Sequence, residues 1–361
     1  MPLIRAPQFS TCATDMSIAH KSRTELLTLA RTLVQPLSPR FHKGQAGKIA
    51  VIGGSEDYTG APFFAAHSAA TVGADLSHVV CELGAGTVIK GYSPDLMVHP
   101  YLQEAARAPP AVAEKVRKIP LEKLDEANAA VDEYVDENVM PKVLGLLERT
   151  DVVVLGPGFG RDHLMLRTLV KILEQIKVMN KPVVLDADAL FLVAQVPSVV
   201  KNYKNAILTP NVVEFGRLAE AVGVDPQADA ASGAMQLSKA LGGVTVVRKG
   251  GSEIIAQEDL HVVSEAAGSP RRVGGQGDTL TGAIATFVAW AQNYHRGLWD
   301  EPVKLSKQES RIVACFAAAN VVREASRLAF ASKRRAMQTS DVHGHLGAAY
   351  EALMGGDHGK M

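Results

Sequence analysis

"GSPRRVGGQGDTLTGAIATFVAWAQ", residues 268–292, is the stretch around which the rest of the chain is arranged. Its first half is glycine-rich and its second half is apolar, without Gly or Pro after Gly282, a pattern that predicts a loop followed by a buried helix. The N–H groups of such a loop converge at the positive end of the helix dipole, which favours a phosphate. Asp278 stands at the junction. A carboxylate there would repel the anion, unless it accepts a proton from a nucleophile that attacks the phosphate.

Asp278 also has a purely structural interpretation, because Asp is a favoured helix N-cap and glycine turns often precede helices. These residues alone leave that alternative open. The stretch is not a P-loop, since the sequence contains no G-x-x-x-x-G-K-[ST], and residues 44–48 read GQAGK before Ile49.

The composition is typical of a soluble globular protein, with 361 residues, of which 47% are hydrophobic and 21% charged. The 38 basic and 38 acidic residues give zero net charge, so we expect no nucleic-acid partner and no membrane partner. The three cysteines, Cys12, Cys81 and Cys315, lie far apart, which favours a reducing compartment and argues against a cysteine metal cluster. The sequence contains no run of 18 apolar residues that would predict a transmembrane helix.

The domain organisation is expected to be simple. Residues 1–23 have few acids and no core-forming pattern. A mitochondrial targeting segment is compatible with them, but we favour a disordered N-terminus of a cytoplasmic protein, dispensable for activity. Residues 24–354 are expected to form one domain, in which residues 102–150 have the charged pattern of an exposed helical insertion or connector without a catalytic part. Residues 355–361 are expected to fray.

Short apolar strands alternate with helical patterns through the middle of the chain. The segments that follow these strands read GPGFGR, DADA, TPN, KGG and, after a hairpin, GGQGD. This alternation predicts a parallel sheet whose strand C-termini line one crevice. The loop at residues 156–161 departs from G-x-G-x-x-G at Arg161, so a standard Rossmann dinucleotide loop is not expected.

Taken in order, these motifs resemble the ATP-dependent NAD(P)H-hydrate dehydratases, a branch of the ribokinase-like superfamily. The resemblance runs from about residue 43 to residue 353 and is carried by KGQAGKIAVIGGSEDYTGAP, SPDLMVHP, GPGFGR, VLDADAL, LTPNVVEFGRL, RKGG and GSPRRVGGQGDTLTG. It implies an α/β fold of three layers, α/β/α, around a central, mostly parallel sheet. It also implies a repair reaction. ATP phosphorylates the C6 hydroxyl of the S form of hydrated NADH or NADPH, and loss of phosphate, a better leaving group than hydroxide, restores the reduced nicotinamide.

The resemblance also implies roles for individual residues. Asp278 would be the base, and the N–H groups of Gly275, Gln276 and Gly277 would form the anion hole. The expected ATP contacts are Lys249, Gly250, Gly251, Ser252, Glu253, Gly268, Ser269, Pro270, Arg271, Arg272, Val273, Gly274, Gly275, Gln276 and Gly277. The expected contacts of the hydrated dinucleotide are Gly158, Asn211, Val212, Val213, Glu214, Phe215, Gly216, Arg217 and Asp278. Mg²⁺ is expected to accompany ATP, and no protein ligand to a metal is assigned.

Structural explanations stay open for several of these residues. Gly158 could simply turn the chain, Asn211 could cap the following helix, and Lys249 could be a solvated strand end. Asp186 and Asp188 could hold Mg²⁺ through water or cap the next helix, and we favour capping.

Two other functions stay open at this point. The chain could be a ribokinase-like kinase that leaves phosphate on a vitamin precursor, or a non-catalytic nucleotide-binding protein. The second is disfavoured because a pure binder gains nothing from a carboxylate beside phosphate. The resemblance also implies ATP and hydrated NAD(P)H as substrates and functional pairing with an NAD(P)H-hydrate epimerase, and a homo-oligomer is compatible with the sequence. The choice between ATP and ADP as donor stays open.

Overall fold

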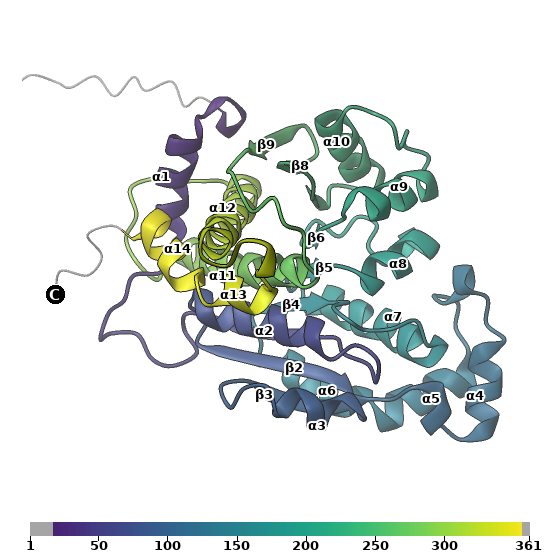
Figure 1. Ribbon diagram of the computed structural model, residues 1–361. Helices are drawn as coiled ribbons and strands as arrows, with labels where there is room; N and C mark the ends of the chain where they lie inside the picture. Colours follow the sequence, from purple (N-terminus) through teal and green to yellow (C-terminus); the bar gives the residue numbers. More distant parts are fainter. Residues whose placement is uncertain (1–16, 356–361) are drawn as a thin grey trace, which may run out of the picture.

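The computed structural model describes residues 17–355, which fold around a nine-stranded sheet (Figure 1). Along the sheet the strands are ordered β3-β2-β1-β4-β5-β6-β7-β8-β9. Neighbours from β3 to β7 are parallel, whereas β8 pairs antiparallel with β7 and with β9. The bounds are β1 (Lys48–Ile52), β2 (Leu76–Glu82), β3 (Met97–Leu102), β4 (Val152–Leu155), β5 (Val183–Leu185), β6 (Ala206–Leu208), β7 (Thr245–Arg248), β8 (Glu253–Gln257) and β9 (Leu260–Ser264).

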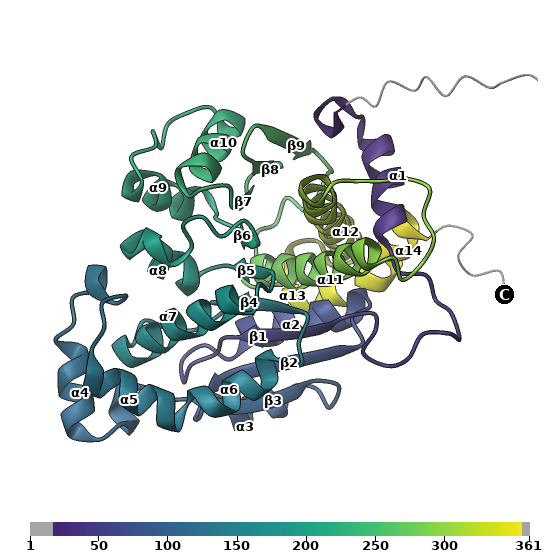
Figure 2. The ribbon, with the colours of Figure 1, turned by 180° about the vertical axis from the view of Figure 1, so that it is seen from behind.

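Helices cover both faces of the sheet (Figures 1 and 2). One face packs against α1 (Arg23–Leu33), α2 (Gly60–Val72), α11 (Gln276–Arg296), α12 (Lys307–Lys333), α13 (Thr339–His343) and α14 (Leu346–Met354). The other packs against α4 (Pro110–Arg117), α5 (Ala129–Asn138), α6 (Met140–Leu147), α7 (His163–Val178), α8 (Asp188–Gln195), α9 (Val212–Ala221) and α10 (Ala230–Ala240). The short α3 (Ala85–Lys90) lies beside β2 and β3. The short 3₁₀ helices are η1 (Ile18–His20), η2 (Ala105–Arg107), η3 (Leu121–Lys123), η4 (Pro197–Val199) and η5 (Arg334–Ala336).

The uninterrupted apolar sequences of the central strands follow from this layering. In β4, Val152 and Val154 face the core that contains α11, whereas Val153 and Leu155 face the core that contains α7. A parallel strand covered on both faces has no solvent-facing side and therefore needs no polar alternation. The α/β class, the three layers and the mostly parallel sheet are confirmed.

The start of α11 is fixed by a close approach to α2. A Cβ atom at Gly282 would lie 1.9 Å from the carbonyl oxygen of Ala65, so only glycine allows the two backbones to come this near. The hydroxyl of Ser68 on α2 also donates to the carbonyl of Thr279 on α11, at 2.5 Å. These contacts determine where the glycine loop before α11 meets the sheet.

Two expectations about the chain are wrong. Residues 102–150 are helical beyond the end of β3, but they are not an exposed insertion throughout, because their apolar side, with Val116, Leu124 and Val143 fully buried, packs into the core on the α7 side. Residues 17–23, expected to lack structure, contain η1, with Ile18 only 1% exposed. Residues 1–16 and 356–361, which include most of the expected disordered N-terminus and frayed tail, lie outside the described residues.

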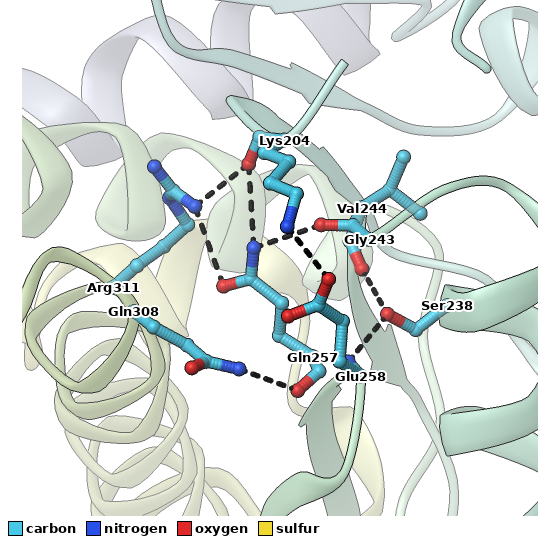
Figure 3. Close-up of polar contacts among 8 residues, drawn as sticks. All are labelled: Lys204, Ser238, Gly243, Val244, Gln257, Glu258, Gln308 and Arg311. Carbon is cyan, nitrogen blue, oxygen red and sulfur yellow. Dashed lines mark hydrogen bonds and ion pairs between the residues drawn. The ribbon is translucent and has the colours of Figure 1, made fainter. Parts of the chain in front are cut away.

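The end of the sheet opposite the strand carboxyl termini is held by polar contacts (Figure 3). Gln257, at the end of β8, donates to the carbonyl of Gly243 before β7 at 2.8 Å, and Gln308 of α12 donates to the carbonyl of Gln257 at 2.7 Å. Arg311 of α12 donates to the carbonyl of Lys204 before β6 at 2.7 Å. The β8–β9 hairpin is thereby tied to α12 and to the parallel part of the sheet.

Among residues 17–355, no helix has the length and apolar character needed to cross a membrane.

Candidate active site

A cavity of about 840 Å³ opens at the carboxyl ends of the parallel strands, beside the start of α11. Asp186 follows β5, Asn211 follows β6 and Lys249 follows β7, and all three line this cavity with the glycine loop. The strand ends that the sequence predicts to meet at one crevice therefore do so for these three strands.

Most of the residues proposed for ATP lie in this lining, but not all of those proposed for the dinucleotide do. Every expected ATP residue lines the cavity except Ser252, Pro270 and Arg271. Of the expected dinucleotide residues, the cavity lining includes Asn211, Val212, Val213, Glu214 and Asp278, and it does not include Gly158, Phe215, Gly216 or Arg217. The structure thus brings the two proposed sets together mainly at the glycine loop and the start of α9.

The glycine loop ends in a left-handed residue. Gly275 has φ of 96°, and a Cβ atom there would lie 2.8 Å from a ring carbon of Phe64, so the turn requires glycine. The first helical hydrogen bond of α11 runs from Thr279 N–H to the Gly275 carbonyl, at 2.9 Å. The preceding N–H groups of the first turn have no intrahelical acceptor, and their residues line the cavity.

Asp278 is the third residue of α11, whose N-cap position is occupied by Gly275. The explanation of Asp278 as merely an N-cap is therefore wrong. Burial raises the pKa of its carboxyl to about 7, and the negative charge of Asp186 adds to this effect. A carboxyl group with a pKa near neutrality, placed in a cleft, is suited to general base catalysis.

Lys249 belongs to a cluster of charged side chains in which Asp186 is buried and Lys249 and Glu214 are half-buried. Its Nζ lies 2.7 Å from Oδ1 of Asp186 and 4.0 Å from Oε2 of Glu214. Burial alone would lower the pKa of Lys249, but the charges of Asp186 and Glu214 outweigh burial and raise it. Lys249 is thus a half-buried, ion-paired cation and not a solvated strand end. A Cβ atom built at Gly277 would lie 3.2 Å from the same Nζ, so the cation lies beside the anion-hole segment.

The capping explanation that we favoured for Asp186 and Asp188 is wrong. The N-cap position of α8 is Ala187, and no side chain caps this helix. Asp186 instead pairs with Lys249. Asp188 accepts the N–H of Gly160 at 2.9 Å and contacts Nε of Arg161 at 3.1 Å.

Asn211 and Glu214 cap the start of α9 reciprocally. Oδ1 of Asn211 accepts the N–H groups of Val213 and Glu214, both at 2.9 Å, and Oε2 of Glu214 accepts the N–H of Asn211 at 2.8 Å. Asn211 therefore serves as a cap and also lines the cavity. Val212 and Val213 are 61% and 62% exposed on the same rim, which leaves apolar surface available to a ligand.

The remaining proposed dinucleotide residues have structural surroundings of their own. Gly158 has φ of 59°, and its carbonyl accepts the N–H of Gly54 at 3.1 Å, so it turns the chain and packs against a neighbouring loop. Phe215 is fully buried, with the guanidinium of Arg248 at 4.1 Å from its ring centroid. Arg217 lines a separate cavity of about 110 Å³ together with Arg161.

Helix α12 supplies lining residues that the sequence interpretation missed. Arg323 donates from Nη2 to Oε1 of Glu253 at 2.7 Å and to the carbonyl of Gly250 at 3.1 Å. Glu253 therefore holds an arginine at the cavity wall. Ser326 accepts from Gln276 at 3.3 Å. The arginines in the mainly small and apolar stretch of residues 310–331, Arg311, Arg323 and Arg327, were the available signal for such a contact.

Comparison with known proteins agrees with this architecture. The family model described as NAD(P)H-hydrate dehydratase matches residues 49–346. A Candida albicans protein named ATP-dependent (S)-NAD(P)H-hydrate dehydratase is 48% identical, with 94% of this chain and 97% of the relative covered. A Schizosaccharomyces pombe protein of the same name is 39% identical, with coverages of 92% and 94%.

Solved structures share the fold at lower identity. A ribokinase-like superfamily protein from Enterococcus faecalis has a TM-score of 0.66 at 18% identity, covering 91% of this chain and 95% of its own. An ADP/ATP-dependent NAD(P)H-hydrate dehydratase from Bacillus subtilis, co-crystallised with ATP/Mg²⁺, has a TM-score of 0.59 at 17% identity, with coverages of 91% and 97%. The fold is thus ribokinase-like, and the family match and the relatives cover nearly the whole chain. The chain therefore belongs to the NAD(P)H-hydrate dehydratase family.

Proposed function

We propose that this protein uses ATP to dehydrate the S form of hydrated NADH and NADPH and so restores the reduced cofactors. The observation that carries the proposal is Asp278, a half-buried carboxyl group with its pKa raised to about 7, in the first turn of a helix whose N-terminal residues line the cavity. The names of the relatives that are 48% and 39% identical support the same reaction.

In the proposed reaction, Asp278 accepts the proton of the C6 hydroxyl while the hydroxyl oxygen attacks the γ-phosphorus of ATP, and ADP leaves. The C6–O bond of the phosphate ester then breaks, phosphate departs, and the neighbouring ring carbon loses a proton. The ring double bond returns, so that hydrated NAD(P)H and ATP become NAD(P)H, ADP, phosphate and a proton.

We assign the stabilisation of the transferring phosphoryl group to the N–H groups of Gly275, Gln276 and Gly277. Their residues lie at the amino end of α11 and line the cavity beside Lys249. Donors that are already aimed at the charge of the transition state need no reorganisation during the reaction. Lys249 adds positive charge at this point, held by Asp186 at 2.7 Å.

Magnesium fits this site as an ion that arrives with the nucleotide. The described residues contain no group of three or more His, Cys, Asp or Glu side chains arranged to hold a metal, and Asp186 and Glu253 already pair with Lys249 and Arg323. Mg²⁺ commonly takes most of its ligands from phosphates and water. When bound, it would neutralise phosphate charge near Asp186, whose Oδ2 lies 3.6 Å from a Cβ atom built at Gly277.

An absorbance assay at 340 nm tests the proposal. Purified S-hydrated NADH and NADPH should each regain reduced-nicotinamide absorbance with ATP, and ADP in place of ATP determines the donor. Accumulation of a stable phosphate ester without recovery of absorbance would instead indicate a kinase of the same superfamily, and ATP binding without turnover would indicate a non-catalytic binder.

We also propose ATP as the physiological donor, a cytoplasmic location and functional pairing with an NAD(P)H-hydrate epimerase. An enzyme restricted to the S form leaves the R form unrepaired, so a second enzyme must interconvert them. With an equal mixture of the S and R epimers of the hydrate, recovery of absorbance should stop near half and continue when an epimerase is added. A homo-oligomer is a further proposal, which size-exclusion chromatography with light scattering tests.

A further inference from the structure

We propose that α13, near the C-terminus, orients the N–H groups of the anion hole by binding the side of the glycine loop that does not line the cavity. Thr339 and His343 are the positioning residues. This inference rests on the proposed function, because it assigns α13 a task in phosphoryl transfer. Neither side chain lines the cavity. Both views place α13 beside the amino-terminal part of α11 and beside α2 (Figures 1 and 2).

The first contact holds the glycine loop itself. The hydroxyl of Thr339, a residue only 3% exposed, donates to the carbonyl of Gly274. Immediately before α13, the carbonyl of Met337 accepts from Nε of Arg271 at 2.8 Å. Two points of the loop, on either side of residues 272 and 273, are therefore bound to the same C-terminal segment.

The second contact holds the first turn of α11 through a buried threonine. The hydroxyl of Thr279 donates to the carbonyl of Gly275 at 2.8 Å and lies 2.9 Å from Nε2 of His343. A hydroxyl has one proton to donate, so Nε2–H of His343 is the donor to Thr279. Nδ1 of His343 then accepts from Nδ1–H of His67 on α2, at 2.8 Å. Burial lowers the pKa of His343 to about 3, which agrees with this neutral tautomer.

These contacts control the direction of the N–H groups because the peptide unit is planar. In a trans peptide, the N–H points opposite to the C=O of the preceding residue, and the described chain has no cis peptide bond. Holding the Gly274 carbonyl therefore directs the N–H of Gly275, and holding the Gly275 carbonyl directs the N–H of Gln276. Both N–H groups belong to the proposed anion hole.

The test replaces the Thr339 hydroxyl while keeping the shape of the side chain. Thr339→Val should lower kcat by roughly tenfold, less than the 10²–10³ lost on removing a donor outright, because the N–H groups are misdirected and not deleted. KM for ATP should change little, since the interaction strengthens in the transition state. Thr339→Ser, which keeps the hydroxyl, should restore kcat to within about twofold.

Thr168→Val is the matched control. Thr168 is a buried threonine on α7, on the opposite face of the sheet, and its hydroxyl donates within its own helix to the carbonyl of Leu164 at 2.8 Å. Thr168→Val should lose stability as Thr339→Val does, but its kcat per folded molecule should equal that of the parent. An equal fall of kcat in both variants, or a normal kcat in Thr339→Val, would overturn the proposal.

Amide hydrogen exchange provides a readout that needs no turnover. In Thr339→Val the amide of Thr279, which donates to the Gly275 carbonyl at 2.9 Å, should exchange faster, while those of β4 and β5 remain as in the parent. His343→Phe should show the same local effect at Thr279, and it serves as the second test if Thr339→Val folds poorly. Unchanged exchange of the Thr279 amide in both variants would refute the positioning role. Inactivity of the parent on hydrated NADH would instead refute the proposed function and leave the exchange result to decide the role of α13.

Discussion

The glycine-rich loops at residues 156–161 and 268–278 differ in their relation to the large cavity, because the second lines it and the first does not. In residues 156–161, the N–H of Phe159 donates to the Gly156 carbonyl at 3.0 Å and the N–H of Gly160 donates to Asp188 at 2.9 Å. In residues 268–278, the carbonyls of Gly274 and Gly275 are held from behind, and the residues that follow line the cavity. Glycine content therefore does not define a phosphate site. What matters is whether the N–H groups are engaged inside the protein or face a cavity.

The largest difference between the two loops is expected when the carboxylate at each loop, Asp278 or Asp188, is replaced by an amide. Asp278→Asn should lower kcat by roughly 10²–10⁴-fold, the usual range for a positioned base. ATP affinity should hold or increase slightly, because a negative charge near the phosphates is removed. Asp188→Asn, at the other loop, should leave kcat near that of the parent. The 340 nm assay together with calorimetric ATP titration measures both quantities. Near-normal turnover of Asp278→Asn would end its assignment as the base.

Alanine substitutions compare the two turns directly. Gly275 and Gly158 have φ of 96° and 59°, and a Cβ atom would lie 2.8 Å from Phe64 and 2.7 Å from the Tyr58 carbonyl oxygen, respectively. Each alanine variant should lose about 1–3 kcal/mol of unfolding free energy through backbone strain. Only Gly275→Ala should also lose kcat per folded molecule, by roughly tenfold or more. Chemical denaturation and the 340 nm assay separate the two effects, and an equal loss of kcat in Gly158→Ala would contradict the contrast.

The pH dependence of kcat/KM should follow the ionisation of Asp278. Burial and the charge of Asp186 raise the pKa of Asp278 to about 7, with Lys249 opposing and Glu214 adding to the rise. A base must be deprotonated, so kcat/KM should fall about tenfold per unit as pH drops well below 7 and should be level above it. A profile that is level down to pH 5 would contradict the assignment.

The same shift predicts an effect on stability. Because the pKa of Asp278 is higher in the folded state than in the unfolded state, the folded protein binds this proton more tightly. The contribution of Asp278 to stability is therefore fully present below its ordinary pKa of 3.8 and is lost as pH rises towards about 7. Asp278→Asn should be the more stable protein above pH 7, and thermal melts of both proteins from pH 5 to pH 8 measure the difference.

The smallest effect is expected from replacing Arg161, in the loop of residues 156–161. Arg161 contacts Asp188 at 3.1 Å and lies 4.2 Å from the ring centroid of Phe191. Arg161→Gln should therefore raise KM for the hydrated dinucleotide by a few-fold at most, with kcat unchanged. A fall in kcat at constant KM would show that this loop takes part in the chemistry after all.

The sequence predicts this architecture well where the information is local. The strand VVVL at residues 152–155 is apolar because both of its faces are covered, and the glycine loop followed by a helix at residues 268–292 follows from adjacent residues. β3 was not predicted, since it is an edge strand that contains Pro100 and its burial alternates incompletely.

The parts of the site that sequence reasoning missed depend on residues far apart in the chain. Arg323 meets Glu253, Thr339 meets Gly274, and Asp186 meets Lys249 only when helices and strand ends pack together. Asp278 was placed at the helix junction correctly, but its position in the first turn follows from the left-handed Gly275. Conformations and contacts of this kind are set by tertiary packing, which the pattern of one stretch does not contain.

The chain of hydrogen bonds from His67 through His343 and Thr279 to Gly275 has a polarity. Each side chain donates one hydrogen bond to the next group in this order. Reversing any single hydrogen bond would therefore place two donors or two acceptors opposite each other. Protonation of His343 would put such a conflict at its contact with His67, 2.8 Å away. Burial places the pKa of His343 at about 3, so the conflict arises only in strongly acidic solution. The glycine loop is thereby insulated from the ordinary range of pH, over which the carboxyl group of Asp278 changes its charge.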